Sequence, residues 1–107
     1  MIYELRIYEC VPGRLPNLHK RFETTTLKIW ERMGIRQAGF WVADVGTSNE
    51  LTYLIAWESL AEREEKWTKF QADPEWNEKR AQSEADGPIV ARVRNTFLRP
   101  TPYSSVQ

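Results

Sequence analysis

The stretch GFWVADVGTSNELTYLIAWESLAER, residues 39–63, carries the pattern that decides the fold. Two runs with strand-like composition, at about residues 36–45 and 51–58, are separated by the turn sequence Gly46-Thr47-Ser48-Asn49. Such runs joined by a glycine-containing turn are typical of a β-hairpin. Ser59 and Glu62 then form a capping-box pattern, which marks the start of a helix. The stretch therefore predicts strand, turn, strand and helix in immediate succession.

Further elements extend this pattern on both sides. Residues 2–10 alternate between two faces and predict a strand, whereas apolar residues spaced by three and four over residues 14–33 predict an amphipathic helix. Asp73-Pro74 marks the start of a short additional helix, and residues 89–98 alternate again. The order predicts an α+β fold, ferredoxin-like βαββαβ with a short extra helix and an antiparallel four-stranded sheet. We expect this domain to span residues 1–100, followed by a tail at 101–107.

The helices of this arrangement lie on one side of the sheet, so the other side is left uncovered. The chain carries 5 Trp, 4 Tyr and 4 Phe in 107 residues. An aromatic sheet face is unfavourable in water and usually marks an interface. Packing two sheets face to face across a two-fold axis would bury it. The sequence therefore predicts a homodimer, a dimeric α+β barrel with a cleft between the paired sheets.

Composition excludes several function classes. Fifteen basic and fifteen acidic side chains cancel, so no long-range field draws the chain to nucleic acid or to an anionic membrane. No apolar run reaches the roughly 20 residues of a membrane span. The strand pattern starts at Ile2, without a signal-peptide pattern before it, and the single cysteine, Cys10, excludes an intrachain disulfide. We therefore expect a cytoplasmic protein with no nucleic-acid partner, no membrane partner and no cofactor.

Six short motifs occur in order along the chain, namely Tyr3-Glu4-Leu5-Arg6-Ile7-Tyr8, Val11-Pro12-Gly13-Arg14, Gly39-Phe40-Trp41, Ser59-Leu60-Ala61-Glu62-Arg63, Asp73-Pro74-Glu75-Trp76 and Asn95-Thr96-Phe97-Leu98. Taken together, these motifs resemble the NIPSNAP family. The resemblance runs from about residue 2 to residue 99. It implies membership of the dimeric α+β barrel superfamily, whose members include cofactor-independent monooxygenases, haem-degrading and haem-binding enzymes, and lactone isomerases. The chain departs from the family pattern in its third strand, where Tyr53 and Ile55 replace a usual His and Trp, and where Trp57 stands at a position that is often Tyr.

The polar face of the first strand provides the main candidate site. We expect the last strand to flank the first, which would bring its arginines near Glu4 and Arg6 if the faces match. One interpretation is an anion-binding cleft with aromatic walls, suited to a small aromatic acid. The other is a ladder of structural salt bridges that sets strand register across the barrel. The candidate ligand-binding residues are Glu4, Arg6, Tyr8, Tyr53, Trp57, Arg92 and Arg94.

Two residues on the predicted helices also allow two interpretations each. His19, the only histidine, could act as a general base or an axial haem ligand, or it could be a boundary residue that bonds to Glu23. One His and one Cys do not supply a zinc site in a single chain. Arg63 is expected on the buried face of its helix, where it would stack on Trp67 and reach a carboxylate. It could serve as a structural anchor or as a ligand contact.

Three functions are compatible with these residues. The first is binding or transformation of a small aromatic or acidic molecule in the barrel cleft. The second is haem binding through His19, and the third is a non-enzymatic protein-interaction module. Motifs for a phosphate-binding loop, a dinucleotide fold or a serine nucleophile do not occur. The sequence does not decide whether the protein is an enzyme.

Overall fold

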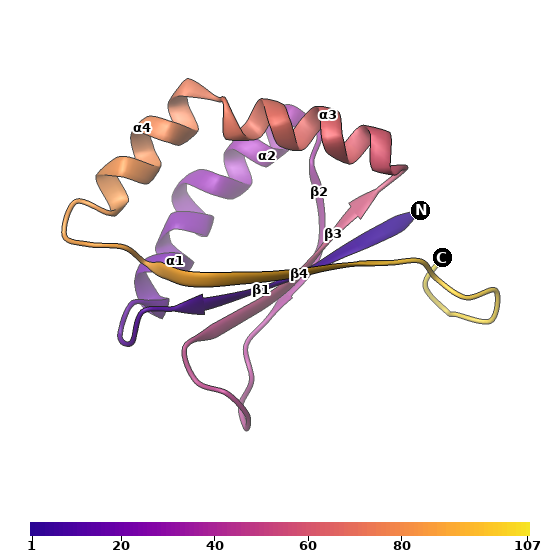
Figure 1. Ribbon diagram of the computed structural model, residues 1–107, viewed down its shortest axis with the longest axis horizontal. Helices are drawn as coiled ribbons and strands as arrows, with labels where there is room; N and C mark the ends of the chain where they lie inside the picture. Colours follow the sequence, from indigo (N-terminus) through magenta and orange to yellow (C-terminus); the bar gives the residue numbers. More distant parts are fainter.

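A computed structural model describes residues 1–107. It contains four strands and a set of helices that follow the predicted order (Figure 1). The elements are β1 (Ile2–Cys10), α1 (Leu15–Arg21), the π-helical segment η1 (Phe22–Thr26), α2 (Leu27–Met33), β2 (Arg36–Trp41), β3 (Glu50–Trp57), α3 (Leu60–Gln71), α4 (Pro74–Ser83) and β4 (Val90–Leu98).

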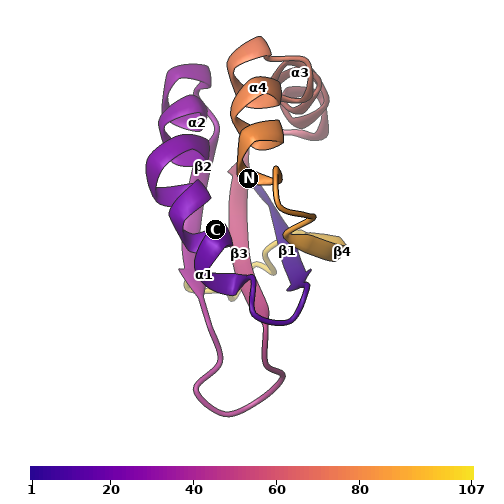
Figure 2. The same cartoon turned by 90° about the vertical axis from the view of Figure 1, so that its left-hand side faces the viewer.

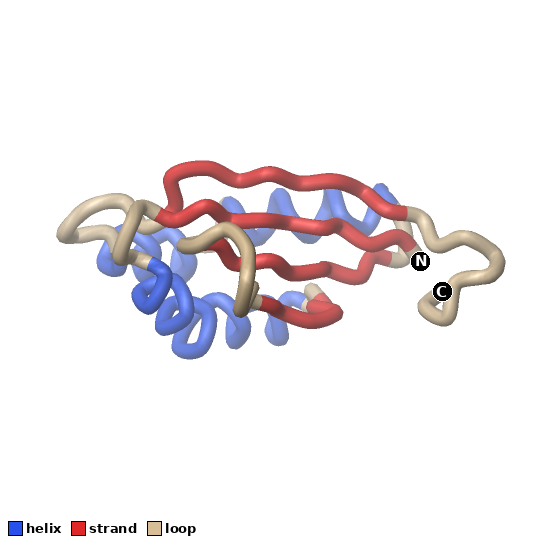
Figure 3. The backbone as a smooth tube through the Cα atoms, turned by 90° about the horizontal axis from the view of Figure 1, so that it is seen from below, coloured by secondary structure: helices blue, strands red, loops and turns tan.

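The four strands form one antiparallel sheet in the order β2-β3-β1-β4. All helices lie on the same side of this sheet, as Figures 2 and 3 show. The predicted ferredoxin-like α+β fold is therefore confirmed. One boundary differs, because β2 ends at Trp41 and not near Val45. Its last ladder pair is Trp41 with Thr52, and the exposed turn to β3 begins directly afterwards.

The first helical stretch begins beside Pro16 and ends at Gly34, as predicted. Gly34 has φ +73°, a left-handed conformation in which glycine carries no steric penalty. Within this stretch, η1 interrupts the α-helical hydrogen bonding: the amide of Leu27 bonds to the carbonyl of Phe22, five residues earlier. The segment keeps Phe22 and Thr26 buried. This π segment is not visible in the sequence pattern, because one extra residue in a turn shifts the apolar spacing only slightly.

The starts of α3 and α4 are set by side-chain caps. Ser59 Oγ accepts a hydrogen bond from the amide of Glu62 at 3.1 Å, and Asp73 Oδ2 accepts one from the amide of Trp76 at 2.9 Å. Both caps are as predicted. The return bond of the capping box differs, because Glu62 Oε1 accepts from the amide of Glu58 at 2.8 Å rather than from that of Ser59. Each helix start is thereby hydrogen-bonded.

The core lies between the sheet and the helices and is rich in aromatic rings. Tyr53 is fully buried, stacks on Phe40 with ring centroids 4.8 Å apart, and meets the ring of Tyr8 edge-on at 5.3 Å. Trp30 packs against the other side of this cluster, 5.7 Å from Tyr53. These contacts fix the rings of β3 and β1 in place beneath the helices. The largest fully buried side chains are Trp30, Trp57, Tyr53, Leu18, Ile55, Ile89 and Glu4.

The two faces of β1 are placed opposite to the sequence-based expectation. Its even-numbered residues, including Glu4 and Arg6, point toward the helices, and all of them except the half-buried Tyr8 are buried. Its odd-numbered residues Tyr3, Leu5 and Ile7 lie on the uncovered face and are only partly buried. The expectation that the polar face lines a cleft between two sheets is therefore wrong. The physical reason is that partners from distant segments satisfy the buried charges, as described next.

Candidate functional site

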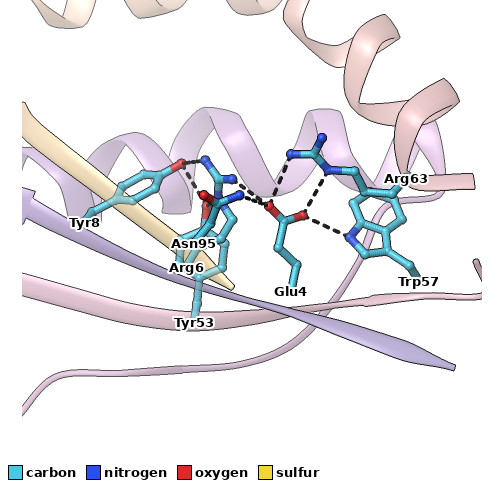
Figure 4. Close-up of polar contacts among 7 residues, drawn as sticks. All are labelled: Glu4, Arg6, Tyr8, Tyr53, Trp57, Arg63 and Asn95. Carbon is cyan, nitrogen blue, oxygen red and sulfur yellow. Dashed lines mark hydrogen bonds and ion pairs between the residues drawn. The ribbon is translucent and has the colours of Figure 1, made fainter. Parts of the chain in front are cut away.

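Five hydrogen bonds converge on the carboxylate of Glu4, which is fully buried (Figure 4). Arg6 donates to it from the same strand at 2.8 Å, and Trp57 Nε1 donates from β3 at 3.1 Å. Arg63 on α3 donates twice, both at 3.2 Å, and Asn95 on β4 donates at 3.0 Å. Because donors from four elements meet at one carboxylate, Glu4 ties the sheet to α3.

The electrostatics of this cluster favour the charged forms. Burial acts to raise the pKa of Glu4, but the hydrogen bonds from Arg63 and Asn95 and the charge of Arg6 outweigh it. The pKa of Glu4 therefore lies below its usual value. Burial also opposes the charge of Arg6, yet the neighbouring oxygens of Tyr8, Tyr53 and Glu4 hold its pKa above the ordinary value. The cluster is thus an ionised group of fixed geometry.

A second chain of hydrogen bonds leads from Arg6 to Tyr8. Arg6 Nε donates to Tyr53 Oη at 2.8 Å, and Tyr53 Oη donates to Tyr8 Oη at 2.8 Å. Arg6 Nη2 donates to Tyr8 Oη at 3.3 Å. Both hydroxyl oxygens thus accept from Arg6, and the proton of Tyr53 lies in the bond between the two tyrosines. Tyr8 Oη accepts two bonds, and its own proton has no acceptor within the protein, so Tyr8 can donate to a ligand.

Of the other residues that bind Glu4, Arg63 was predicted from the sequence and Asn95 was not. Arg63 was predicted to stack on Trp67 and reach a carboxylate; its guanidinium carbon lies 5.5 Å from that ring, and the carboxylate is Glu4. The contact of Asn95 with Glu4 does not follow from the local sequence pattern. The position of Asn95 in the motif at residues 95–98 was the available signal, but pairing Asn95 with Arg6 across the sheet requires the register of β1 and β4.

Arg92 and Arg94 are not part of this cluster. The ladder pairs Arg92 with Glu9 and Arg94 with Ile7, which places both side chains on the uncovered face of the sheet. There Arg92 forms an ion pair with Glu9, and Arg94 pairs with Glu50 at 3.1 Å. Successive side chains of a strand point to opposite faces, so Asn95 reaches Glu4 while Arg94 cannot. The expectation that these arginines sit near Glu4 and Arg6 is therefore wrong.

A cavity of about 380 Å³ lies next to the cluster, between the sheet and the helices. Arg6 and Tyr8 line it from β1, and residues 90–93 line it from the edge strand β4. Its volume falls within the range of about 300–1,000 Å³ that is typical of small-molecule sites. The lining residues are Arg6, Tyr8, Arg21, Trp67, Phe70, Gln71, Trp76, Arg80, Glu84, Pro88, Val90, Ala91, Arg92 and Val93.

A second buried arginine, Arg21, lines the same cavity from the end of α1. Its Nη1 donates to Ser83 Oγ at 3.3 Å and to Glu84 Oε1 at 3.1 Å, and its guanidinium carbon lies 5.4 Å from the ring of Trp76. Arg6 and Arg21 are each only 7% exposed. Neither composition nor spacing marked Arg21, because its partners lie more than sixty residues away in the sequence.

The lining also contains an unpartnered donor. Trp76 is 7% exposed, and its buried Nε1 has no hydrogen-bond partner in the protein. Buried polar groups are hydrogen-bonded in the great majority of cases, so each exception calls for an explanation. This nitrogen is enclosed by the protein, so the neutral donor that the cavity offers beside its two arginines is the hydroxyl of Tyr8.

His19 lies away from the cavity. It lines a separate, mostly apolar pocket of about 320 Å³ with Phe22, Phe40 and Trp41 among its neighbours. The hydrogen bond from His19 to Glu23 that one interpretation required is not formed.

Cys10 is buried, and burial raises the pKa of its thiol. No group of three His, Cys, Asp or Glu side chains is arranged to hold a metal ion. None of the helices has the length and apolar character needed to cross a membrane.

Comparison with known proteins first defines the class of protein. The crystal structure of protein Atu4242 from Agrobacterium tumefaciens superimposes with a TM-score of 0.87 over the whole of both chains, at 25% identity. A single-residue mutant of MhuD, solved with two manganese protoporphyrin IX molecules per active site, shares the fold with a TM-score of 0.61. That match covers 94% of both chains at 18% identity, and it shows the fold alone. The chain is thus an α+β protein of the ferredoxin-like kind.

The sequence comparisons then identify the family. The NIPSNAP family profile matches residues 3–105, so the chain belongs to the NIPSNAP family. A relative, the NipSnap homolog protein of Dictyostelium discoideum, is 29% identical over 106 residues, or 99% of this chain. The chain spans about 40% of the length of that relative.

Proposed function

We propose that the protein binds a small organic anion with an aromatic or conjugated body in the cavity between β1, β4 and the helices. The observation that supports this most directly is the presence of two arginines, Arg6 and Arg21, each more than nine-tenths buried, on the wall of one cavity. This site lies between the sheet and the helices, whereas the sequence predicted a cleft between two paired sheets. The proposed ligand class, a small aromatic or acidic molecule, is the one that the sequence predicted.

The chemistry of the lining favours such a ligand. Arg6 uses three of its five N–H groups on Glu4, Tyr53 and Tyr8, so two remain for a carboxylate. The rings of Tyr8, Trp67, Phe70 and Trp76 provide flat apolar walls. Guanidinium groups bind carboxylates by charge-assisted hydrogen bonds, and aromatic walls bury the rest of the ligand.

A binding assay with matched ligands tests this proposal. We expect 2-naphthoate to bind the purified protein in isothermal titration calorimetry, and the neutral 2-naphthamide of nearly the same shape to bind about tenfold more weakly or worse. The substitution Arg21→Gln should also weaken naphthoate binding, but by a smaller factor, because Arg6 can still pair with the single carboxylate. The matched control is Arg32→Gln, because Arg32 pairs with Asp73 and Glu75 outside the cavity and should leave binding unchanged.

Two results would contradict the proposal. One is the absence of binding for a panel of aromatic and conjugated carboxylates at millimolar concentration. The other is equal affinity for acid and amide, since a site that depends on two buried guanidiniums must distinguish them. Circular dichroism of each variant shows whether a loss of binding reflects a loss of folding.

The homodimer also belongs to this proposal. The uncovered face of the sheet carries Leu5, Ile7 and Leu54 on its central strands, with Trp41 52% exposed at its edge. Its charged residues already pair among themselves, Arg92 with Glu9 and Arg94 with Glu50, so a second copy of the face would not be repelled. An apolar face without net charge favours self-association across a two-fold axis.

Sedimentation equilibrium tests the dimer. The wild-type protein should sediment as a dimer at micromolar concentration, and Leu5→Lys should sediment as a folded monomer. Leu60→Lys is the matched control, because Leu60 is 56% exposed on α3, on the other side of the sheet. A monomeric wild type, or a Leu5→Lys variant that stays dimeric, would contradict this part of the proposal.

Haem binding is the alternative that His19 suggests. Its support is the apolar pocket of about 320 Å³ around His19 and the likeness of the fold to MhuD, which carries a metalloporphyrin. Titration with haemin checks it: a Soret band that depends on His19 would favour haem over the anion, and a band unchanged in His19→Ala would remove this alternative. A role as a protein-interaction module and a cytoplasmic location stay predictions.

A further inference from the structure

We propose that the ligand of the cavity is a dianion, with two anionic groups held apart by a planar body. This inference rests on the proposed function and narrows it to one ligand class, that of aromatic or conjugated dicarboxylates. It follows from the balance of charge around the two buried arginines of the lining and from the aromatic ring against which each of them packs.

The first surplus of charge lies on the sheet side. Glu4 is shared by Arg6 and Arg63, with ion-pair distances of 2.8 and 3.2 Å. Two guanidiniums and one carboxylate leave a net charge of +1, since 2 − 1 = 1. Of these three groups, Arg6 lines the cavity. The group therefore carries one surplus positive charge, and Arg6 is the member through which a ligand in the cavity can reach it.

The second surplus lies on the helix side. Glu84 is shared by Arg21 and Arg80, with ion-pair distances of 3.1 and 3.4 Å. These groups also carry a net charge of +1, and all three line the cavity. Glu84 is the only acidic residue of the lining. The fourth arginine, Arg92, is neutralised by Glu9 and adds nothing to the balance.

The two surplus charges are presented by different layers of the protein. Arg6 comes from the sheet and stacks over the ring of Trp67, with its guanidinium carbon 4.5 Å from the ring centroid. Arg21 comes from α1 and lies 5.4 Å from the ring of Trp76. Each arginine is thus held against an indole, and the rings of Tyr8 and Phe70 complete the lining. A ligand with one anionic group could neutralise only one of these two surplus charges.

A ligand with two anionic groups and a flat body matches all of these features at once. One group pairs with Arg6 and accepts from the free proton of Tyr8, and the other pairs with Arg21. Because each trio of charges carries a surplus of +1, a ligand that neutralises both surpluses is preferred over a monoanion.

Calorimetry with benzoate, phthalate, isophthalate and terephthalate tests the inference at neutral pH, where every carboxyl group is ionised. We expect the best dicarboxylate to bind at least about tenfold more tightly than benzoate. Raising the salt concentration should weaken the dicarboxylate more than benzoate, because Arg80 is half exposed and its charge is screened.

Variants separate this inference from the proposed function. In Arg21→Gln the affinity of the best dicarboxylate should exceed that of benzoate by a factor of only about 1–2. Benzoate binding should weaken less than dicarboxylate binding, because benzoate can still bind at Arg6. Arg80→Gln, at an exposed position that should not affect folding, should lower the ratio of the two affinities by about threefold, and Arg32→Gln should leave it unchanged. If benzoate binds as tightly as every dicarboxylate, the dianion inference is wrong and the anion site stands. If no member of the series binds, both are wrong.

Discussion

The substitution Glu4→Gln keeps the shape of a buried side chain and removes its charge. In the wild type, five donors from four elements meet the two carboxylate oxygens. An amide replaces one oxygen by a donor, so at least two of these hydrogen bonds face another donor, and Arg6 and Arg63 lose their counter-charge. Breaking a buried ion pair by removing one partner costs about 3–5 kcal/mol. We expect Glu4→Gln to lower the free energy of unfolding by about this amount.

Urea denaturation followed by tryptophan fluorescence measures this change. A loss of this size is a large fraction of the roughly 5–15 kcal/mol that stabilises a typical domain, and it should lower the melting temperature by roughly 10–20 °C. Glu65→Gln is the control, because Glu65 pairs with Lys69 on the surface and should cost no more than about 0.5 kcal/mol. A loss below about 1 kcal/mol for Glu4→Gln would refute the view that Glu4 is the counter-charge of this cluster.

The same residue predicts a pH dependence. The pKa of Glu4 is lowered in the folded state, so its contribution to stability is fully present above the ordinary carboxyl pKa. The contribution is lost as the pH falls through the lowered folded value. The difference in stability between wild type and Glu4→Gln should therefore shrink toward acid pH, and a difference that grows on acidification would contradict the assignment.

Three further substitutions probe other parts of the structure. Tyr53→Phe removes the acceptor of Arg6 Nε and should cost about 1–3 kcal/mol in urea denaturation, whereas Tyr103→Phe, at an exposed position, should cost nothing measurable. Gly39→Ala should cost about 1–3 kcal/mol or more, because Gly39 has φ +117° and a Cβ atom there would clash with the Trp41 ring; a melting temperature equal to that of wild type would contradict this. Ser59→Ala removes the cap of α3 and should cost about 1 kcal/mol, which Ser59→Asp should restore.

The fold could be predicted because its signals are local. The caps at Ser59 and Asp73, the glycine at the end of α2 and the two-residue alternation of the strands each depend on neighbours within a few positions. Strand order then follows from the few ways in which such units connect. The end of β2 was predicted less well, because the ladder with β3 contains an irregularity between Gln37 and Phe40 that the sequence does not show.

The site could be predicted only in part, because it depends on contacts across the sheet. Alternation divides β1 into two sets of side chains, but it does not say which set faces the helices. A Glu–Arg–Tyr face resembles a solvent face until Trp57, Arg63 and Asn95 are placed around the carboxylate. The side on which Arg92 and Arg94 fall follows from the register of β4, and that register shifts between Glu9 and Cys10.

Because Glu4 and its partners are buried, the arginines of the cavity are held in fixed positions before any ligand binds. An exposed arginine site would lack this preorganisation. Arg6 is held by Glu4, Tyr53 and Tyr8, and Arg21 is held by Ser83 and Glu84. Long cationic side chains lose much rotamer freedom when a ligand orders them, and this loss weakens binding. Because the protein has already ordered both guanidiniums during folding, a ligand would meet donors in fixed positions. The network that stabilises the sheet against α3 is therefore also the part of the structure that would orient an anion.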